Sequence, residues 1–192
     1  MPTFSGQPVS DPQVSPDGTR ILFTYTTANI NENKYNSHIW MLSPDGGKPR
    51  QFTHGKDNDT NPTWSPDGRM VAFLSNRARG EEKPAEEKKR KNQIWIIPVD
   101  GGEARCLTEV AEGAQRPIWS PDGKSILFSS SVLKGEKPKD SDVKIIRRIK
   151  YKYNARGFFE GKWTHLFSVS AEKGKVSQLT DGEFDVDAVA PS

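Results

Sequence analysis

The sequence has little of what secreted or membrane-bound proteins carry. Cys106 is the only cysteine among 192 residues, which excludes an internal disulfide and favours a cytoplasmic location. No apolar run approaches the length of a membrane span, and the first residues lack the basic and apolar segments of a secretory signal peptide. We therefore expect no membrane association.

Neither sign of charge dominates. The 28 basic residues are set against 25 acidic ones, so the net charge is only +3, and this balance favours solubility over a nucleic-acid partner. Apolar residues make up 33% of the chain, whereas glycine and proline are frequent, with 16 and 14 copies. Because glycine and proline interrupt regular elements, this composition predicts many short strands and an all-β fold.

One tetrapeptide, Ser-Pro-Asp-Gly, occurs three times. Its copies begin at Ser15, Ser65 and Ser120, which are 50 and 55 residues apart. Proline presets the first turn position, aspartate bonds nearby backbone amides, and glycine accepts the left-handed conformation that returns the chain as a hairpin. We assign a structural role to the aspartates and glycines of these turns: Asp17, Gly18, Asp67, Gly68, Asp122 and Gly123.

Each repeat contains signals for four strands. A proline lies three residues before each serine, an apolar run follows each turn, and a second strand pair comes later, for example His38–Leu42 with Arg50–Thr53. Repeats of about 50 residues with four antiparallel strands are typical of β-propeller blades. Trp40, Trp64, Trp95 and Trp119 are then expected in the core between blades.

The sequence thus predicts a partial β-propeller of three four-stranded antiparallel blades. We expect a single partial domain over 1–192, with blades at about 8–55, 58–110 and 113–182 and the start of another blade at 184–192. Three blades do not close a propeller, so a fragment is expected. Its open edges would be covered by the missing blades or by another copy in a homo-oligomer.

The link between the second and third strands differs from blade to blade. It is short and polar in blade one (about 26–37), highly charged in blade two (81–91) and long in blade three (about 131–163). In blade three, residues 145–153 show a period-two pattern with one apolar-leaning face and one basic face, which predicts an extended β-hairpin insertion.

This insertion is strongly basic, with six basic and no acidic residues from Lys144 to Arg156. A solvated strand face would explain these charges. The alternative is a surface that binds carboxylates of a peptide or an acidic partner, for which the candidate substrate-binding residues are Arg147, Arg148, Lys150 and Tyr151.

Complete catalytic machinery is missing from the sequence. There is no Gly-x-Ser-x-Gly elbow, and the strand signal around Gly123-Lys-Ser125 does not fit a phosphate-binding loop. His38 and His165 occupy equivalent strand starts, and Cys106 is interpreted as a small strand residue. The sequence therefore predicts no catalytic residue, no metal site and no cofactor in this chain.

The repeat as a whole resembles two known groups. Its pattern of Pro-x-Trp-Ser-Pro-Asp-Gly, then Ile-Trp, Asp-Gly-Gly and Leu-Thr, is similar to the propeller repeats of prolyl-oligopeptidase-family (S9) serine peptidases and of TolB-like (PD40) proteins. The insertion Arg147–Tyr153, followed by Gly157-Phe158 and Thr164–Phe167, resembles the amino-terminal propeller of acylaminoacyl-peptidase members.

That resemblance implies a role in peptide hydrolysis. In the family, further blades and an α/β-hydrolase domain with a Ser-Asp-His triad follow the propeller, which restricts entry to short or unfolded peptides. The expected function is therefore gating and positioning of peptide substrates in a serine peptidase of acylaminoacyl, dipeptidyl or oligopeptidase type, whose catalytic domain is absent here. A non-enzymatic TolB-like interaction module is the alternative.

Overall fold

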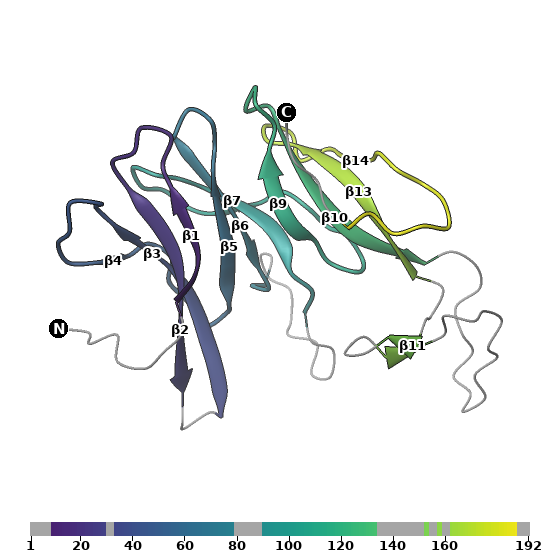
Figure 1. Ribbon diagram of the computed structural model, residues 1–192, viewed down its shortest axis with the longest axis horizontal. Helices are drawn as coiled ribbons and strands as arrows, with labels where there is room; N and C mark the ends of the chain where they lie inside the picture. The colour runs from purple at the N-terminus through teal and green to yellow at the C-terminus, as the bar shows by residue number, and fades with distance from the viewer. Residues whose placement is uncertain are drawn as a thin grey trace.

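The computed structural model describes residues 9–29, 33–78, 90–133, 152–153, 157–158 and 162–187. The described elements are all strands, and they form three four-stranded antiparallel sheets that follow one another in chain order (Figure 1). The predicted all-β, three-bladed architecture is confirmed. No helix in the described part is long and apolar enough to cross a membrane.

Each sheet is an antiparallel meander, and in the third sheet β11 and β12 lie along the chain between the paired strands β10 and β13. The first sheet contains β1 (Val9–Val14), β2 (Ile21–Asn29), β3 (Lys34–Leu42) and β4 (Arg50–Gln51). The second contains β5 (Asp59–Trp64), β6 (Met70–Ser75), β7 (Gln93–Pro98) and β8 (Arg105–Cys106). The third contains β9 (Gln115–Trp119), β10 (Ser125–Leu133), β13 (Lys162–Ser170) and β14 (Val176–Gln178).

The first strands of the sheets lie innermost. Each first strand forms one end of its own sheet. Across the seams, β1 contacts β5 and β5 contacts β9. Side chains on facing sheets pack into two apolar clusters, one at each seam between neighbouring blades. The buried residues of the first seam are Leu22, Ile39, Met41, Trp64, Val71, Phe73, Trp95 and Val99.

Three of the four tryptophans expected between blades are buried there. Trp64 and Trp95 belong to the first seam and Trp119 to the second. Trp40 is only partly buried and meets Tyr25 edge-on, with ring centroids 5.9 Å apart. Unlike Trp95, Trp40 belongs to neither of the two apolar clusters between the described sheets.

The link between β2 and β3 is shorter than the range of about 26–37 predicted from the sequence. Its flanks continue the strands, because β2 and β3 stay paired from Thr26 opposite Ser37 to Asn29 opposite Lys34. β-Branched and aromatic residues favour extended backbone, which explains why a polar segment still extends the hairpin.

Only part of the blade-three insertion is described, and at its two ends β10 and β13 stay paired as far as Leu133 opposite Lys162. β11 (Lys152–Tyr153) pairs antiparallel with β12 (Gly157–Phe158) as a separate two-stranded ladder. The rest of the predicted hairpin, including 145–151, lies outside the described residues.

Candidate functional site

The three Ser-Pro-Asp-Gly turns share one hydrogen-bond pattern. In the second blade the Ser65 hydroxyl donates to Asp67 Oδ1 over 2.6 Å, the Arg69 amide donates to the same oxygen, and the Met70 amide donates to Ser65 Oγ. The equivalent bonds hold the turns of the first and third blades. These aspartates are thus occupied in stabilising their turns.

Those bonds also fix the charge of the turn aspartates. Hydrogen bonds from the Ser15 hydroxyl and from Thr19 lower the pKa of Asp17 to about 2. The corresponding serine and backbone donors lower the pKa of Asp67 and of Asp122. All three are therefore ionised near neutral pH, which does not suit a proton donor.

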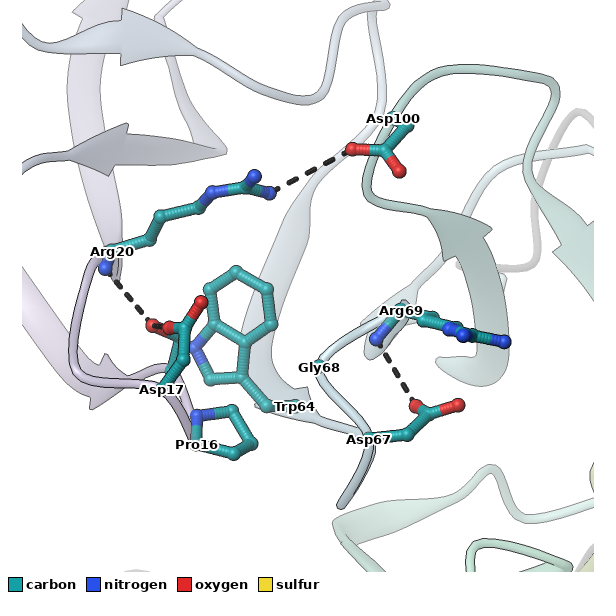
Figure 2. A pocket seen from close by; sticks show the side chains of 9 residues that line it. Pro16, Asp17, Arg20, Trp64, Asp67, Gly68, Arg69 and Asp100 are labelled. Atoms are coloured by element: carbon teal, nitrogen blue, oxygen red, sulfur yellow. Dashed lines mark hydrogen bonds and ion pairs between the residues drawn. The ribbon is translucent and has the colours of Figure 1, made fainter.

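A cleft opens between successive turns at each seam. The first, of about 350 Å³, lies between the turn of blade one and that of blade two and is lined by both, together with Trp64. Figure 2 shows Arg20 reaching across this cleft toward Asp100, with a 3.9 Å separation between the charged groups. The second cleft, of about 580 Å³, has the same position between blades two and three.

Both seams are closed beneath these clefts by the same contacts. The Trp64 indole N–H donates to the Gln13 carbonyl over 3.1 Å, and the Trp119 indole N–H donates to the Thr63 carbonyl over 3.2 Å. Each acceptor lies two residues before the serine of the preceding blade's turn. These tryptophans thus tie blades two and three to the inner strand of the blade before each, which is a packing role.

The positive φ of these turns favours glycine, and two of the glycines lie next to the proline of the preceding turn. Gly68 has a φ of +68°, and a Cβ added there would lie 3.7 Å from Cδ of Pro16 in the preceding turn. Gly123 has the same φ and a similar proline neighbour, Pro66, at 3.6 Å. Neighbouring turns therefore pack directly against each other at each seam.

A buried ionic cluster lies at the opposite end of the first seam. Asp59, at the start of β5, is fully buried, and the Arg77 guanidinium donates to its Oδ2 over 2.5 Å. Arg77 also donates to Ser75 Oγ, and its guanidinium lies 5.4 Å from the ring centre of Phe73 and 5.2 Å from that of Trp95. Aromatic faces stabilise such a cation in addition to the carboxylate.

The cluster also joins two blades. Nδ1 of His38, in the first sheet, lies 3.9 Å from Asp59 Oδ2. Burial acts to raise the pKa of Asp59, but His38, Arg77 and Ser75 outweigh it and hold that pKa below its usual value of 3.8. Asp59 is therefore an ionised anchor between the blades rather than an acid or base.

The sequence did not reveal this cluster. The positions equivalent to Asp59 are Val9 and Ala114, so it is not part of the repeat. The available signal was the strand register, because Asp59 pairs with Ser75 and so lies beside the residue two positions before Arg77. His38 was assigned to the repeat architecture, and its contact with Asp59 adds an interaction between the blades.

None of the predicted substrate-binding residues is among those that the structure describes. Arg147, Arg148, Lys150 and Tyr151 lie outside the described residues, so their assignment stays a prediction. Within the described ranges, no group of three or more histidine, cysteine, aspartate or glutamate side chains is arranged to hold a metal ion. The described part thus offers turns, seams and a buried ion pair, all of which organise a scaffold.

Comparisons with known proteins identify a family and several relatives with similar sequences. A family profile described as "PD40: TolB beta propeller domain" matches residues 2–139. The Bacillus subtilis protein named "Uncharacterized peptidase YuxL" is 35% identical over 185 residues, covering 92% of this chain and 27% of that protein. "Dipeptidyl-peptidase 5" of Porphyromonas gingivalis is 28% identical over 132 residues, covering 69% of this chain and 18% of that protein.

A solved structure agrees in fold. The acylaminoacyl peptidase of Pyrococcus horikoshii superimposes with a TM-score of 0.68 at 21% identity, over 90% of this chain and 25% of that one. The chain therefore spans about a quarter of the length of YuxL and of this peptidase.

Proposed function

The chain belongs to the TolB β-propeller (PD40) family, and on that basis we propose that its blades form part of the propeller of a serine-type peptidase. In the whole protein this propeller admits short peptides and positions them for a hydrolase domain. The observation that carries the proposal is the 35% identity to a protein named as a peptidase, across 92% of this chain. The fold of the described part supports it, since its three four-stranded sheets superimpose on the solved acylaminoacyl peptidase.

The first prediction concerns the activity of the whole protein that contains this chain. We expect a fluorophosphonate probe to label one serine outside residues 1–192, because fluorophosphonates react with activated serine nucleophiles. The same protein should cleave a short peptide and leave the same sequence intact when it is embedded in a folded domain. Labelling on a denaturing gel and mass spectrometry of the products measure both.

A protein heated before the probe is added is the matched control, because unfolding abolishes the activated nucleophile. If the native protein neither reacts with the probe nor cleaves any peptide, the peptidase proposal is wrong. A whole protein that instead binds protein partners without cleaving them would be the TolB-like interaction module that the family name equally allows.

The basic insertion supplies the second prediction. In the whole protein we expect Arg147→Ala with Arg148→Ala to lower kcat/KM for peptides with acidic side chains or a free carboxylate by about fivefold, because exposed charge pairs contribute up to about 1 kcal/mol. Neutral, amidated peptides should be cleaved at an unchanged rate.

A variant that removes two positive charges elsewhere separates local binding from net charge. Lys48→Ala with Lys173→Ala is suitable, since both lysines are exposed in turns. Equal kinetics of the arginine variant and the unmodified protein toward all peptides would remove these arginines from substrate binding.

A further inference from the structure

Three residues on the inner strands adopt an unusual backbone conformation. Asp11, Asn61 and Arg116 have φ values of +53°, +51° and +52°. They occupy the same repeat position, immediately before Pro12, Pro62 and Pro117. We call these three residues the inner rim.

This conformation is costly for side-chain-bearing residues. A residue before proline normally adopts an extended conformation, and side-chain-bearing residues rarely adopt positive φ because it strains the backbone. The register between first and second strands shifts at this place in β1 and β5, between Ser10 and Gln13 and between Thr60 and Thr63. Bulges of this kind redirect side chains and are frequent next to functional sites.

The rim lies on the first strand of each of the three sheets. β1, β5 and β9 contact one another in series, and each has a strand of its own sheet on one side only. Asn61 and Arg116 are exposed, and Asp11 is partly exposed. Their side chains are therefore accessible beside the free inner edges of three adjacent blades.

The three rim residues share one backbone conformation, but their side chains differ in charge. Going from blade one to blade three, the side chain changes from a carboxylate to an amide and then to a guanidinium. Asn61 Nδ2 donates to Asp11 Oδ1 over 3.4 Å, so the first two groups are connected across the seam. Arg116 donates from one terminal nitrogen to the Asp187 carbonyl, and its guanidinium carries further N–H donors.

We propose that the inner rim binds a short peptide with both termini free, its ammonium group at Asp11 and its carboxylate at Arg116, with Asn61 bonding the backbone between them. The graded charge of the rim matches the dipole of such a peptide, and an arginine suits a carboxylate. The inference rests on the proposed function, because it names the ligand that the propeller positions.

At two rim positions the charge can be removed by a residue that tolerates the positive-φ backbone conformation. Asp11→Asn and Arg116→Asn each introduce the residue that blade two already carries at this position, and asparagine tolerates positive φ. Binding of trialanine to the 192-residue chain is measured by calorimetry with four probes: the free peptide, its N-acetyl form, its C-terminal amide and the doubly blocked form.

We expect each free terminus to strengthen binding about three- to fivefold, the range of an exposed charge pair. Arg116→Asn should abolish the preference for a free carboxylate and leave the preference for a free ammonium group unchanged. Asp11→Asn should have the opposite effect, abolishing only the preference for a free ammonium group. Asp45→Asn and Lys48→Asn, which remove exposed charges in the turn between β3 and β4, should change neither preference.

Equal affinity for all four probes, no measurable binding, or rim variants that behave like the turn variants would overturn the proposal. Because no catalysis is measured, this result is separate from that of serine labelling. Peptide binding at the rim together with a failed labelling experiment would retain the rim and reject the peptidase.

Discussion

Replacing Trp119 by alanine is expected to lower the free energy of unfolding of the chain by about 3 to 5 kcal/mol, the usual cost of removing a buried tryptophan. The side chain is only 6% exposed, belongs to the apolar cluster between blades two and three, and donates its indole N–H to the Thr63 carbonyl. The change therefore creates a cavity and also leaves an inner-strand carbonyl without its donor. Urea unfolding followed by circular dichroism measures the effect.

Two further variants separate these contributions. Trp119→Phe keeps an aromatic ring but loses the donor, so it should cost about 1 to 2 kcal/mol. Tyr35→Ala removes an aromatic side chain that is 69% exposed and should change stability by less than about 0.5 kcal/mol. If Trp119→Ala were as mild as Tyr35→Ala, tryptophan would not be what holds the blades together.

Replacing Asp59 by asparagine is expected to cost about 2 to 4 kcal/mol at neutral pH, because loss of one partner leaves a mostly buried Arg77 cation without its carboxylate. Asp59 is fully buried, and 22% of the Arg77 side chain is exposed. Replacing both partners by apolar residues, Asp59→Leu with Arg77→Met, should recover part of that loss. The pair of Asp57 and Arg90 is the control, because its carboxylate is 37% exposed where that of Asp59 is fully buried, so Asp57→Asn should cost less than about 1 kcal/mol.

The same pair makes stability depend on pH in a defined direction. The pKa of Asp59 is lower in the folded chain than its usual value of 3.8, so the unfolded chain takes up the proton first as pH falls. The stabilisation is complete above about pH 4 to 5 and is lost as the pH falls from there through the folded-state pKa. The stability difference between the unmodified chain and Asp59→Asn should therefore shrink on acidification; a difference that stays constant down to pH 3 would contradict the ionised pair.

The repeat made most of the fold predictable. Proline, aspartate and glycine act through local geometry, so the three turns and the strands on either side of them follow from short stretches of sequence. The tryptophans before the second and third turns could likewise be assigned to the seams. Their common acceptor, a carbonyl on the preceding inner strand, was not predictable, because main-chain acceptors leave no mark in the sequence.

The features missed by sequence reasoning depend on contacts between distant segments. Asp59 is charged at a position where the other blades carry Val9 and Ala114, and only the pairing of β5 with β6 brings it to Arg77. The inner rim was unpredictable for a different reason. A residue before proline is normally extended, so the left-handed conformation of Arg116 contradicts its local preference and must be imposed by the sheet around it.

The hydrogen bonds from Trp64 and Trp119 to the preceding inner strand join the three blades at their two seams. Hydrogen exchange of the indole N–H groups, followed by NMR with ¹⁵N-labelled tryptophan and assigned through Trp64→Phe and Trp119→Phe, tests both bonds at once. We predict that each indole N–H exchanges only when the blades at its own seam separate. Each single variant should therefore change the exchange rate of the other tryptophan little. Exchange of either indole at the rate of free tryptophan in the native chain would contradict the proposed seams.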